Sequence, residues 1–210
     1  MDKLRELVKA GEVEETVTRV EELLRAGKSP EAMMKEAMIP AMDEVGDLFQ
    51  KGDYFMPEML IAARAMQQGM NVLKPHMVKS GIKPTGKVLV GTVKGDLHDI
   101  GKNLVTMALE GAGFGVIDLG TDVAPARFIE AIKQHQPQVL GLSALLTTTM
   151  RAMKDTIDAI KAAGLRDRVK IMIGGAPIRQ EFCVEIGADF YGPDSTSGRN
   201  YARDVVSGKA

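Results

Sequence analysis

The sequence contains one cysteine, no tryptophan and few aromatic residues of any kind. A single thiol excludes a disulfide within the chain and is typical of a reducing compartment. The formal net charge is −1, so no general attraction to nucleic acid or to an anionic membrane surface is expected. The sequence has no apolar run of about 18 residues, and its N-terminal segment is charged, so neither a membrane span nor a secretory signal is expected. We therefore expect a soluble, cytoplasmic protein.

Residues 1–78 have the pattern of a small helical bundle. Apolar residues recur at helical spacing, and Ser29 followed by Pro30 is typical of a helix start. Pro40 predicts a kink in the helix that follows, and a further helix is expected over residues 57–77. With the short opening segment, these signals predict a four-helix bundle, which carries ten of the chain's 14 methionines, mostly as core residues.

The pattern changes after a linker that we place at residues 79–86, which contains glycine and proline and has no periodicity. Over residues 87–210, short apolar runs alternate with helical segments, which predicts a parallel sheet covered by helices on both faces. The expected strands are residues 87–93, 114–120, 138–144, 169–175 and 189–192. In a flavodoxin-like strand order, a ligand binds beside the loops that follow the first and third strands.

The loop after the first expected strand contains Asp96-Leu97-His98 between Gly95 and Gly101. A histidine in this place can offer one ring nitrogen to a metal while the other nitrogen donates to Asp96, the arrangement that orients a metal-bound imidazole. Glycine lets the backbone turn tightly and lets a large group approach. The alternative is a solvated loop with a local hydrogen bond, in which Asp99 caps the following helix.

Two other kinds of site fit this loop less well. A zinc ion held by protein groups needs three or four ligands, and His76, His135 and Cys183 show no ligand spacing to His98. A dinucleotide site would need the G-x-G-x-x-G pattern, which is absent, and aspartates would repel a pyrophosphate. One good ligand without companions indicates a metal that brings most of its own ligands.

The loops after the third and fourth expected strands are also unusual. GLSALLTTTM is dense in hydroxyl groups, which indicates either a helix cap at Thr148 or Thr149, or a buried polar lining for an inserted ligand. GGAPI, at residues 174–178, permits a flat ligand to pack against backbone. In the helical half, DYFMPEM is an apolar helix start, which predicts a bundle core or a lid over a large apolar ligand.

Three motifs together carry a resemblance to a known family. They are Asp96-x-His98-x-x-Gly101, then Ser143-x-Leu145-x-Thr147, then Gly174-Gly175-Ala176. Over essentially the whole chain, the sequence resembles the corrinoid proteins of methyltransferase systems and the cobalamin-binding fragment of methionine synthase. The resemblance implies a four-helix bundle cap (1–78), followed by a flavodoxin/Rossmann-like α/β domain with a five-stranded parallel sheet that binds the corrinoid (87–210). The implied cofactor is cobalamin or a related cobamide.

The resemblance also implies roles for single residues. His98 would be the lower axial ligand to cobalt, Asp96 would hydrogen-bond His98, and Thr149 would continue this relay where the family usually has serine. A deep slot for the displaced nucleotide tail would be lined by Gly101, Ser143, Leu145, Thr147, Gly174, Gly175 and Ala176. The upper, methyl-bearing face would be capped by Phe55, Met56 and Met59.

The implied function is that of a non-catalytic methyl carrier. Cobalt(I) would accept a methyl group from a substrate-specific methyltransferase, and methyl-cobalt(III) would deliver it to a second methyltransferase that acts on coenzyme M or tetrahydrofolate. A reductive activase is a further implied partner. The alternatives are a cobalamin-dependent sensor, for which the sequence has no helix-turn-helix output element, and a mutase small subunit, which would not be expected to carry the methionine-rich cap. The methyl donor, the acceptor and the lower base of the cobamide stay open.

Overall fold

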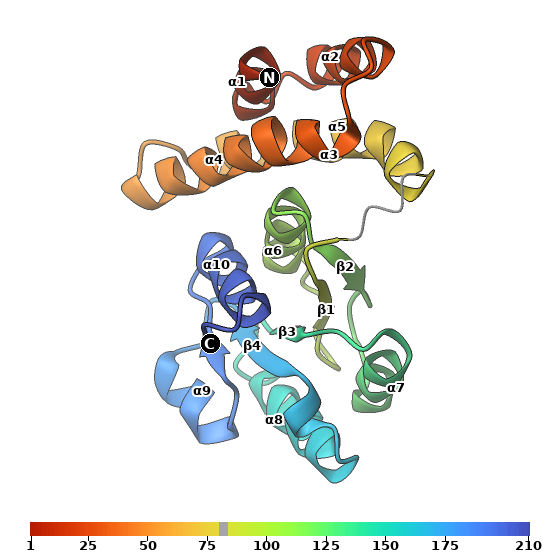
Figure 1. Cartoon of the computed structure of the whole chain (residues 1–210). Helices are drawn as coiled ribbons and strands as arrows, with labels where there is room; N and C mark the ends of the chain where they lie inside the picture. Colours follow the sequence, from red (N-terminus) through yellow and green to blue (C-terminus); the bar gives the residue numbers. More distant parts are fainter. Residues whose placement is uncertain (80–83) are drawn as a thin grey trace. The chain divides into compact units, whose positions relative to one another are not determined.

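The structure, a computed structural model, describes residues 1–79 and 84–210, without the side chains of residues 78 and 79. The chain forms two compact units, residues 1–85 with 110–113, and residues 86–109 with 114–210 (Figure 1). Part of the linker expected at residues 79–86 lies outside the described residues. Among the described helices, none is both long and apolar enough to cross a membrane.

The helical unit contains the helices that the sequence predicts. Ser29 begins one of them, because its Oγ accepts a hydrogen bond from Ala32 N at 3.0 Å. Its elements are α1 (Asp2–Ala10), α2 (Val13–Arg25), α3 (Pro30–Met33), the π-helical turn η1 (Met34–Met38), α4 (Ile39–Lys51) and α5 (Met56–Lys79). Elements α3, η1 and α4 follow one another without a break, so they form one irregular helix.

The irregularity lies next to Pro40, where a kink is expected. A proline inside a helix lacks the amide donor and clashes with the carbonyl four residues earlier. The chain accommodates this with the π turn, in which Ile39 N donates to Met34 O, five residues earlier. Met33, Met38 and Met66 are almost fully buried, which confirms that much of the methionine content forms core.

The second unit is an α/β fold with one parallel sheet. Its elements are β1 (Lys87–Thr92), α6 (Ile100–Gly111), β2 (Gly115–Asp118), α7 (Pro125–His135), β3 (Val139–Ser143), α8 (Met150–Ala162), η2 (Arg166–Arg168), β4 (Lys170–Gly174), α9 (Gln180–Ile186), β5 (Phe190–Tyr191) and α10 (Ser195–Val206). The strand order is β2-β1-β3-β4-β5, and all neighbours are parallel. This is the predicted flavodoxin-like order, and its switch point lies between β1 and β3.

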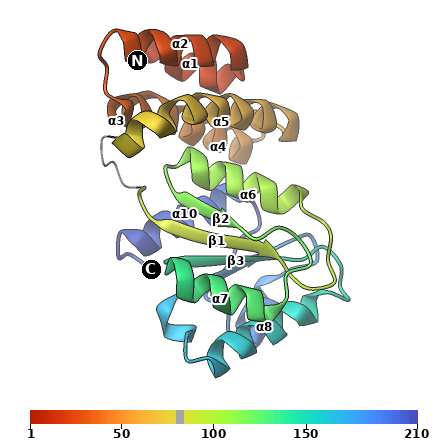
Figure 2. The same cartoon turned by 90° about the vertical axis from the view of Figure 1, so that its right-hand side faces the viewer.

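The two faces of the sheet are filled differently. Helices α7 and α8 cover one face, and α6 and α10 cover the other (Figure 2). The first face is a continuous apolar core in which Phe128, Leu140 and Ile157 are fully buried. On the other face, Gly141 and Ser143 of the central strand β3 are only half-buried. This face of the sheet therefore has small, partly accessible residues on β3, which borders the switch point.

Candidate functional site

The site is built on the loop that joins β1 to α6. Val93 N donates to Ser143 O at 3.0 Å, which ties the end of β1 to the end of β3. Asp96 N donates to Val93 O at 3.1 Å, and Gly95 has a φ of 84°, a left-handed conformation that glycine adopts at no steric cost. This tight turn directs the Asp96 side chain inward, where it is fully buried.

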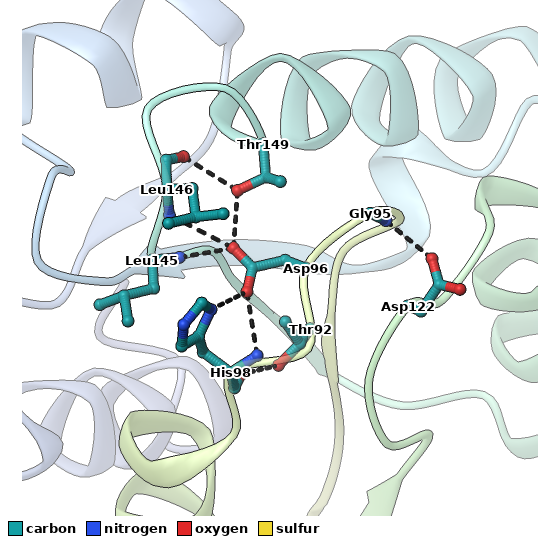
Figure 3. Close-up of polar contacts among 8 residues, drawn as sticks. All are labelled: Thr92, Gly95, Asp96, His98, Asp122, Leu145, Leu146 and Thr149. Atoms are coloured by element: carbon teal, nitrogen blue, oxygen red, sulfur yellow. Dashed lines mark hydrogen bonds and ion pairs between the residues drawn. The ribbon is translucent and has the colours of Figure 1, made fainter.

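The buried Asp96 carboxylate accepts hydrogen bonds from two loops (Figure 3). Its Oδ1 lies 2.7 Å from His98 Nδ1 and accepts from His98 N at 3.0 Å. Its Oδ2 accepts from Thr149 Oγ1 at 2.6 Å, and from the backbone amides of Leu145 at 2.8 Å and Leu146 at 3.3 Å. Donors surround both oxygens, so the site is built for a charged carboxylate.

Burial is the largest single influence on the pKa of Asp96, and it acts to raise it. The hydrogen bonds from Thr149, His98 and Leu145 act in the opposite direction, because they stabilise the charged form. Their combined effect is greater, so the pKa of Asp96 lies well below its usual range. The group is therefore an anion at neutral pH, although no solvent reaches it.

The anionic partner fixes the state of the His98 ring. A carboxylate only accepts, so the ring nitrogen Nδ1 carries the proton and donates to Asp96. The opposite nitrogen, Nε2, points away from Asp96, and the side chain of His98 is 49% exposed. Thr92 Oγ1 also donates to the His98 carbonyl at 2.9 Å, which holds the backbone. In the neutral tautomer with the proton on Nδ1, this arrangement leaves Nε2 free to ligate a metal.

Thr149 lies at the N-cap position of α8, but its side chain makes no capping bond to that helix. Its hydroxyl instead faces Asp96 Oδ2 at 2.6 Å and the Leu146 carbonyl at 2.9 Å, and its single proton serves one acceptor at a time. Thr149 therefore does not cap α8 with its side chain, and its hydroxyl makes a buried polar contact with Asp96. Thr149, Asp96 and His98 form a continuous hydrogen-bonded chain.

Apolar side chains near this chain are exposed. Leu97 and Ile100 are 73% and 72% exposed, and Leu145 and Leu146 are each 42% exposed. Exposed apolar groups gathered in one place are typical of a ligand or partner surface. Sequence reasoning missed Leu97, Ile100 and Leu146, although two of them stand out as apolar residues in a loop rich in aspartate and glycine.

The remaining candidates on the α/β unit lie at the ends of β3 and β4, on the loops that follow these strands, and at the start of α6. Ser143 and Gly174 are register partners at the ends of β3 and β4, and both are half-buried. Gly175 has a φ of 137°, and a Cβ built there would lie 1.8 Å from Ala144 O. Gly101 is exposed on α6, and a Cβ there would contact nothing within 4 Å. Thr147 and Ala176 are exposed on their loops.

The three residues expected to cap the upper face belong to the helical unit, at the start of α5. Phe55 is 65% exposed and Met56 is 43% exposed, so both are available to contact another group. Met59 is different, because only 6% of it is exposed. Met59 is therefore buried within the helical unit, whereas Phe55 and Met56 are accessible.

The donor set fits a metal that arrives with its own ligands. Among the described residues, no three His, Cys, Asp or Glu side chains form a cluster that could hold a bare metal ion. His98 offers one nitrogen, and the exposed leucines and isoleucine beside it suit a flat apolar ring. Ser143 and Gly174 are small, half-buried residues at the ends of β3 and β4.

Comparison with known proteins identifies the family. B12 binding domain families match residues 86–198 and residues 1–74. Trimethylamine corrinoid protein 1 of Methanosarcina acetivorans is 44% identical over 188 residues, 89% of this chain and 87% of that protein. Dimethylamine corrinoid protein 2 of the same organism is 40% identical over 181 residues, 86% of this chain and 84% of that protein.

Solved structures agree with this assignment. The methanol:cobalamin methyltransferase complex MtaBC of Methanosarcina barkeri matches with a TM-score of 0.87 and 30% identity, over 98% of this chain and 78% of that one. A cobalamin-binding protein of Desulfitobacterium hafniense matches with a TM-score of 0.79 and 31% identity, over 97% of both chains. The chain therefore belongs to the B12-binding corrinoid proteins of methyltransferase systems.

Proposed function

We propose that this chain is a methyl carrier that holds cobalamin or a related cobamide at the carboxyl edge of its sheet. The observation that carries the proposal is the hydrogen-bonded chain from Thr149 through buried Asp96 to half-exposed His98. When bound, the corrinoid supplies the chemistry, because its cobalt takes up and releases the methyl group. The protein supplies binding, an axial nitrogen and access.

Each part of the site has a task in this proposal. His98 Nε2 would ligate the cobalt, and Asp96 increases the basicity of the ring by accepting a hydrogen bond from Nδ1–H. Thr149 and the amides of Leu145 and Leu146 keep the carboxylate charged and in place. The nucleotide tail would lie in a slot along Gly101, Ser143, Leu145, Thr147, Gly174, Gly175 and Ala176.

We propose in addition that residues 1–78 form a cap domain and residues 87–210 the corrinoid-binding domain. Phe55 and Met56 would cover the methyl-bearing face, since both are exposed at the start of α5. Met59 would take part only after a rearrangement of the helical unit, because it is buried there. Such a movement is the gating step that a carrier needs in order to meet its partners in turn.

Two methyltransferases are the expected partners. The identity to trimethylamine and dimethylamine corrinoid proteins favours a methylamine-specific enzyme as the one that loads the carrier. The likeness to a methanol:cobalamin methyltransferase complex supports direct contact with such an enzyme. A second methyltransferase would pass the methyl group to coenzyme M or tetrahydrofolate, and a reductive activase would restore the reduced cobalt.

The first experiment is an absorption spectrum of the protein after reconstitution with hydroxocobalamin and desalting. We expect corrinoid absorption to stay with the protein, to shift to the cobalt(I) form on reduction, and to shift again when a methyl donor is added. Loss of all corrinoid on desalting would contradict the proposal. A bound corrinoid that accepts only an adenosyl group would instead favour the mutase alternative.

His98→Ala is expected to keep the fold and lose the protein-derived axial ligand, because the side chain is half-exposed and its ring makes one hydrogen bond. Electron paramagnetic resonance of the cobalt(II) state checks this when histidine is labelled with ¹⁵N. In the wild type, the label should change the nitrogen splitting from a triplet to a doublet, whereas the variant spectrum should be insensitive to it. The matched control is His135→Ala, in which the label must still act. A label effect that survives in His98→Ala would contradict the ligand assignment.

A further inference from the structure

The turn between β2 and α7 lies beside the loop that carries His98, and the proposed function leaves it without a task. It begins at Asp118, ends at Asp122, and contains Leu119, Gly120 and Thr121. A parallel bridge between Val93 and Val123 brings the two segments together. Each of the two aspartates contacts a different flank of the His98 loop.

Asp122 holds the flank that precedes His98. Its Oδ1 accepts from Gly95 N at 2.7 Å, and its own amide donates to the Asp96 carbonyl at 2.9 Å (Figure 3 shows the first of these bonds). Asp122 has a φ of 53°, in the left-handed region where aspartate and asparagine are tolerated better than most residues. This conformation lets Asp122 form hydrogen bonds with both Gly95 and Asp96. The backbone of Asp96 is therefore held by a residue outside the His98 loop.

Asp118 holds the flank that follows His98, through Lys102 in the first turn of α6. Only 4% of the Lys102 side chain is exposed, and its Nζ is paired with Asp118 Oδ2 and donates to Asn103 Oδ1 at 2.7 Å. A buried ammonium group requires such partners, so this ion pair ties the start of α6 to the end of β2. The other oxygen of Asp118 accepts from Gly120 N at 2.8 Å and closes the turn.

We propose that Asp118 and Asp122 are positioning residues, which hold both flanks of the His98 loop. They keep the His98 imidazole hydrogen-bonded to Asp96, with Nε2 available to cobalt. The inference rests on the proposed function and adds to it two residues that act on His98 through Gly95, Asp96 and Lys102. Metal ligation is sensitive to errors of a few tenths of an ångström in the supporting groups, so loss of either contact should weaken axial coordination before it unfolds the protein.

Three substitutions of Asp122 separate its contributions. Asp122→Asn keeps an oxygen acceptor and tolerates the left-handed backbone, so we expect coordination close to that of the wild type. Asp122→Gly keeps the backbone conformation but removes the acceptor, and Asp122→Ala loses both. For these two, the ratio of histidine-coordinated to uncoordinated cobalt(II), measured by the ¹⁵N label effect, should fall about tenfold. In the apoprotein, the Gly95 amide should exchange its hydrogen faster in Gly and Ala but not in Asn.

Lys102→Met tests the other flank, because methionine fills a similar volume and removes the ammonium group. We expect a comparable fall in the histidine-coordinated fraction, with the Gly95 amide still protected. Wild-type coordination in Asp122→Gly, Asp122→Ala and Lys102→Met would overturn the inference, as would failure of Asp122→Asn to rescue. Failure of the proposed function is distinguishable, because the wild type itself would then retain no corrinoid or show no label effect.

Discussion

Gly175→Ala is expected to lower the free energy of unfolding of the α/β unit by about 3 kcal/mol or more. Gly175 has a φ of 137°, which a residue with a Cβ rarely adopts, and the added carbon would lie 1.8 Å from Ala144 O. The obstacle is backbone, so no side-chain rotation relieves it. Ala144 is itself tied to the neighbouring strand, because its amide donates to Gly174 O at 3.3 Å. Urea denaturation of the apoprotein measures the change.

Gly101→Ala is the matched control for that substitution. A Cβ at Gly101 would contact nothing within 4 Å, and the residue lies in α6 without a positive φ, so stability should stay the same or rise by up to about 1 kcal/mol. If Gly101 also faces the bound corrinoid, as proposed, this stable variant should retain less of it. A Gly175→Ala protein as stable as the wild type would show that the two loops move apart freely.

Asp96→Asn should reduce the free energy of unfolding by about 2–4 kcal/mol, because it replaces a charged acceptor oxygen with an NH2 donor of nearly the same size. Both oxygens of Asp96 face donors: His98 N and Nδ1 on one side, and Thr149 Oγ1 with the Leu145 and Leu146 amides on the other. An asparagine amide group therefore points its own hydrogens at other donors in either orientation. Chemical denaturation of the apoprotein measures the loss, and the ¹⁵N label effect in the cobalt(II) state should weaken as well.

Two controls make the Asp96 result specific. Asp99 is exposed and its carboxylate accepts from the Asn103 side chain at 3.0 Å, so Asp99→Asn should change stability by no more than about 0.5 kcal/mol. Thr149→Ser keeps the hydroxyl that faces Asp96 and should behave like the wild type, whereas Thr149→Val should not. Equal stability of the Asp96→Asn and Asp99→Asn proteins would mean that the buried carboxylate is not the anchor of the two loops.

The local pattern of the sequence was sufficient to predict the kinds of element and their order. Apolar runs at the spacing of buried strands predicted a five-stranded parallel sheet, and the structure has it in the flavodoxin-like order. The expected strand at 114–120 is shorter, at Gly115–Asp118, because the chain turns at Asp118 and Gly120. Strand ends depend on such contacts rather than on periodicity, so they are less predictable.

The sequence also pointed to the residues of the proposed chemistry, Asp96 and His98 through their local motif and Thr149 through the family resemblance. Asp96, His98 and Thr149 are separated by up to 53 residues, yet the switch-point rule placed their loops together because β1 and β3 are neighbours in this strand order. Only the tertiary structure decided the contacts that depend on the third dimension. These are the donors around Asp96, the close approach of Gly175 to Ala144 and the burial of Met59. They also include the hydrogen bond of Asp122 to Gly95 and the ion pair of Asp118 with Lys102, which hold the His98 loop. A pattern along the chain reports which face of an element is apolar, whereas hydrogen bonds between loops depend on the register of the strands that carry them.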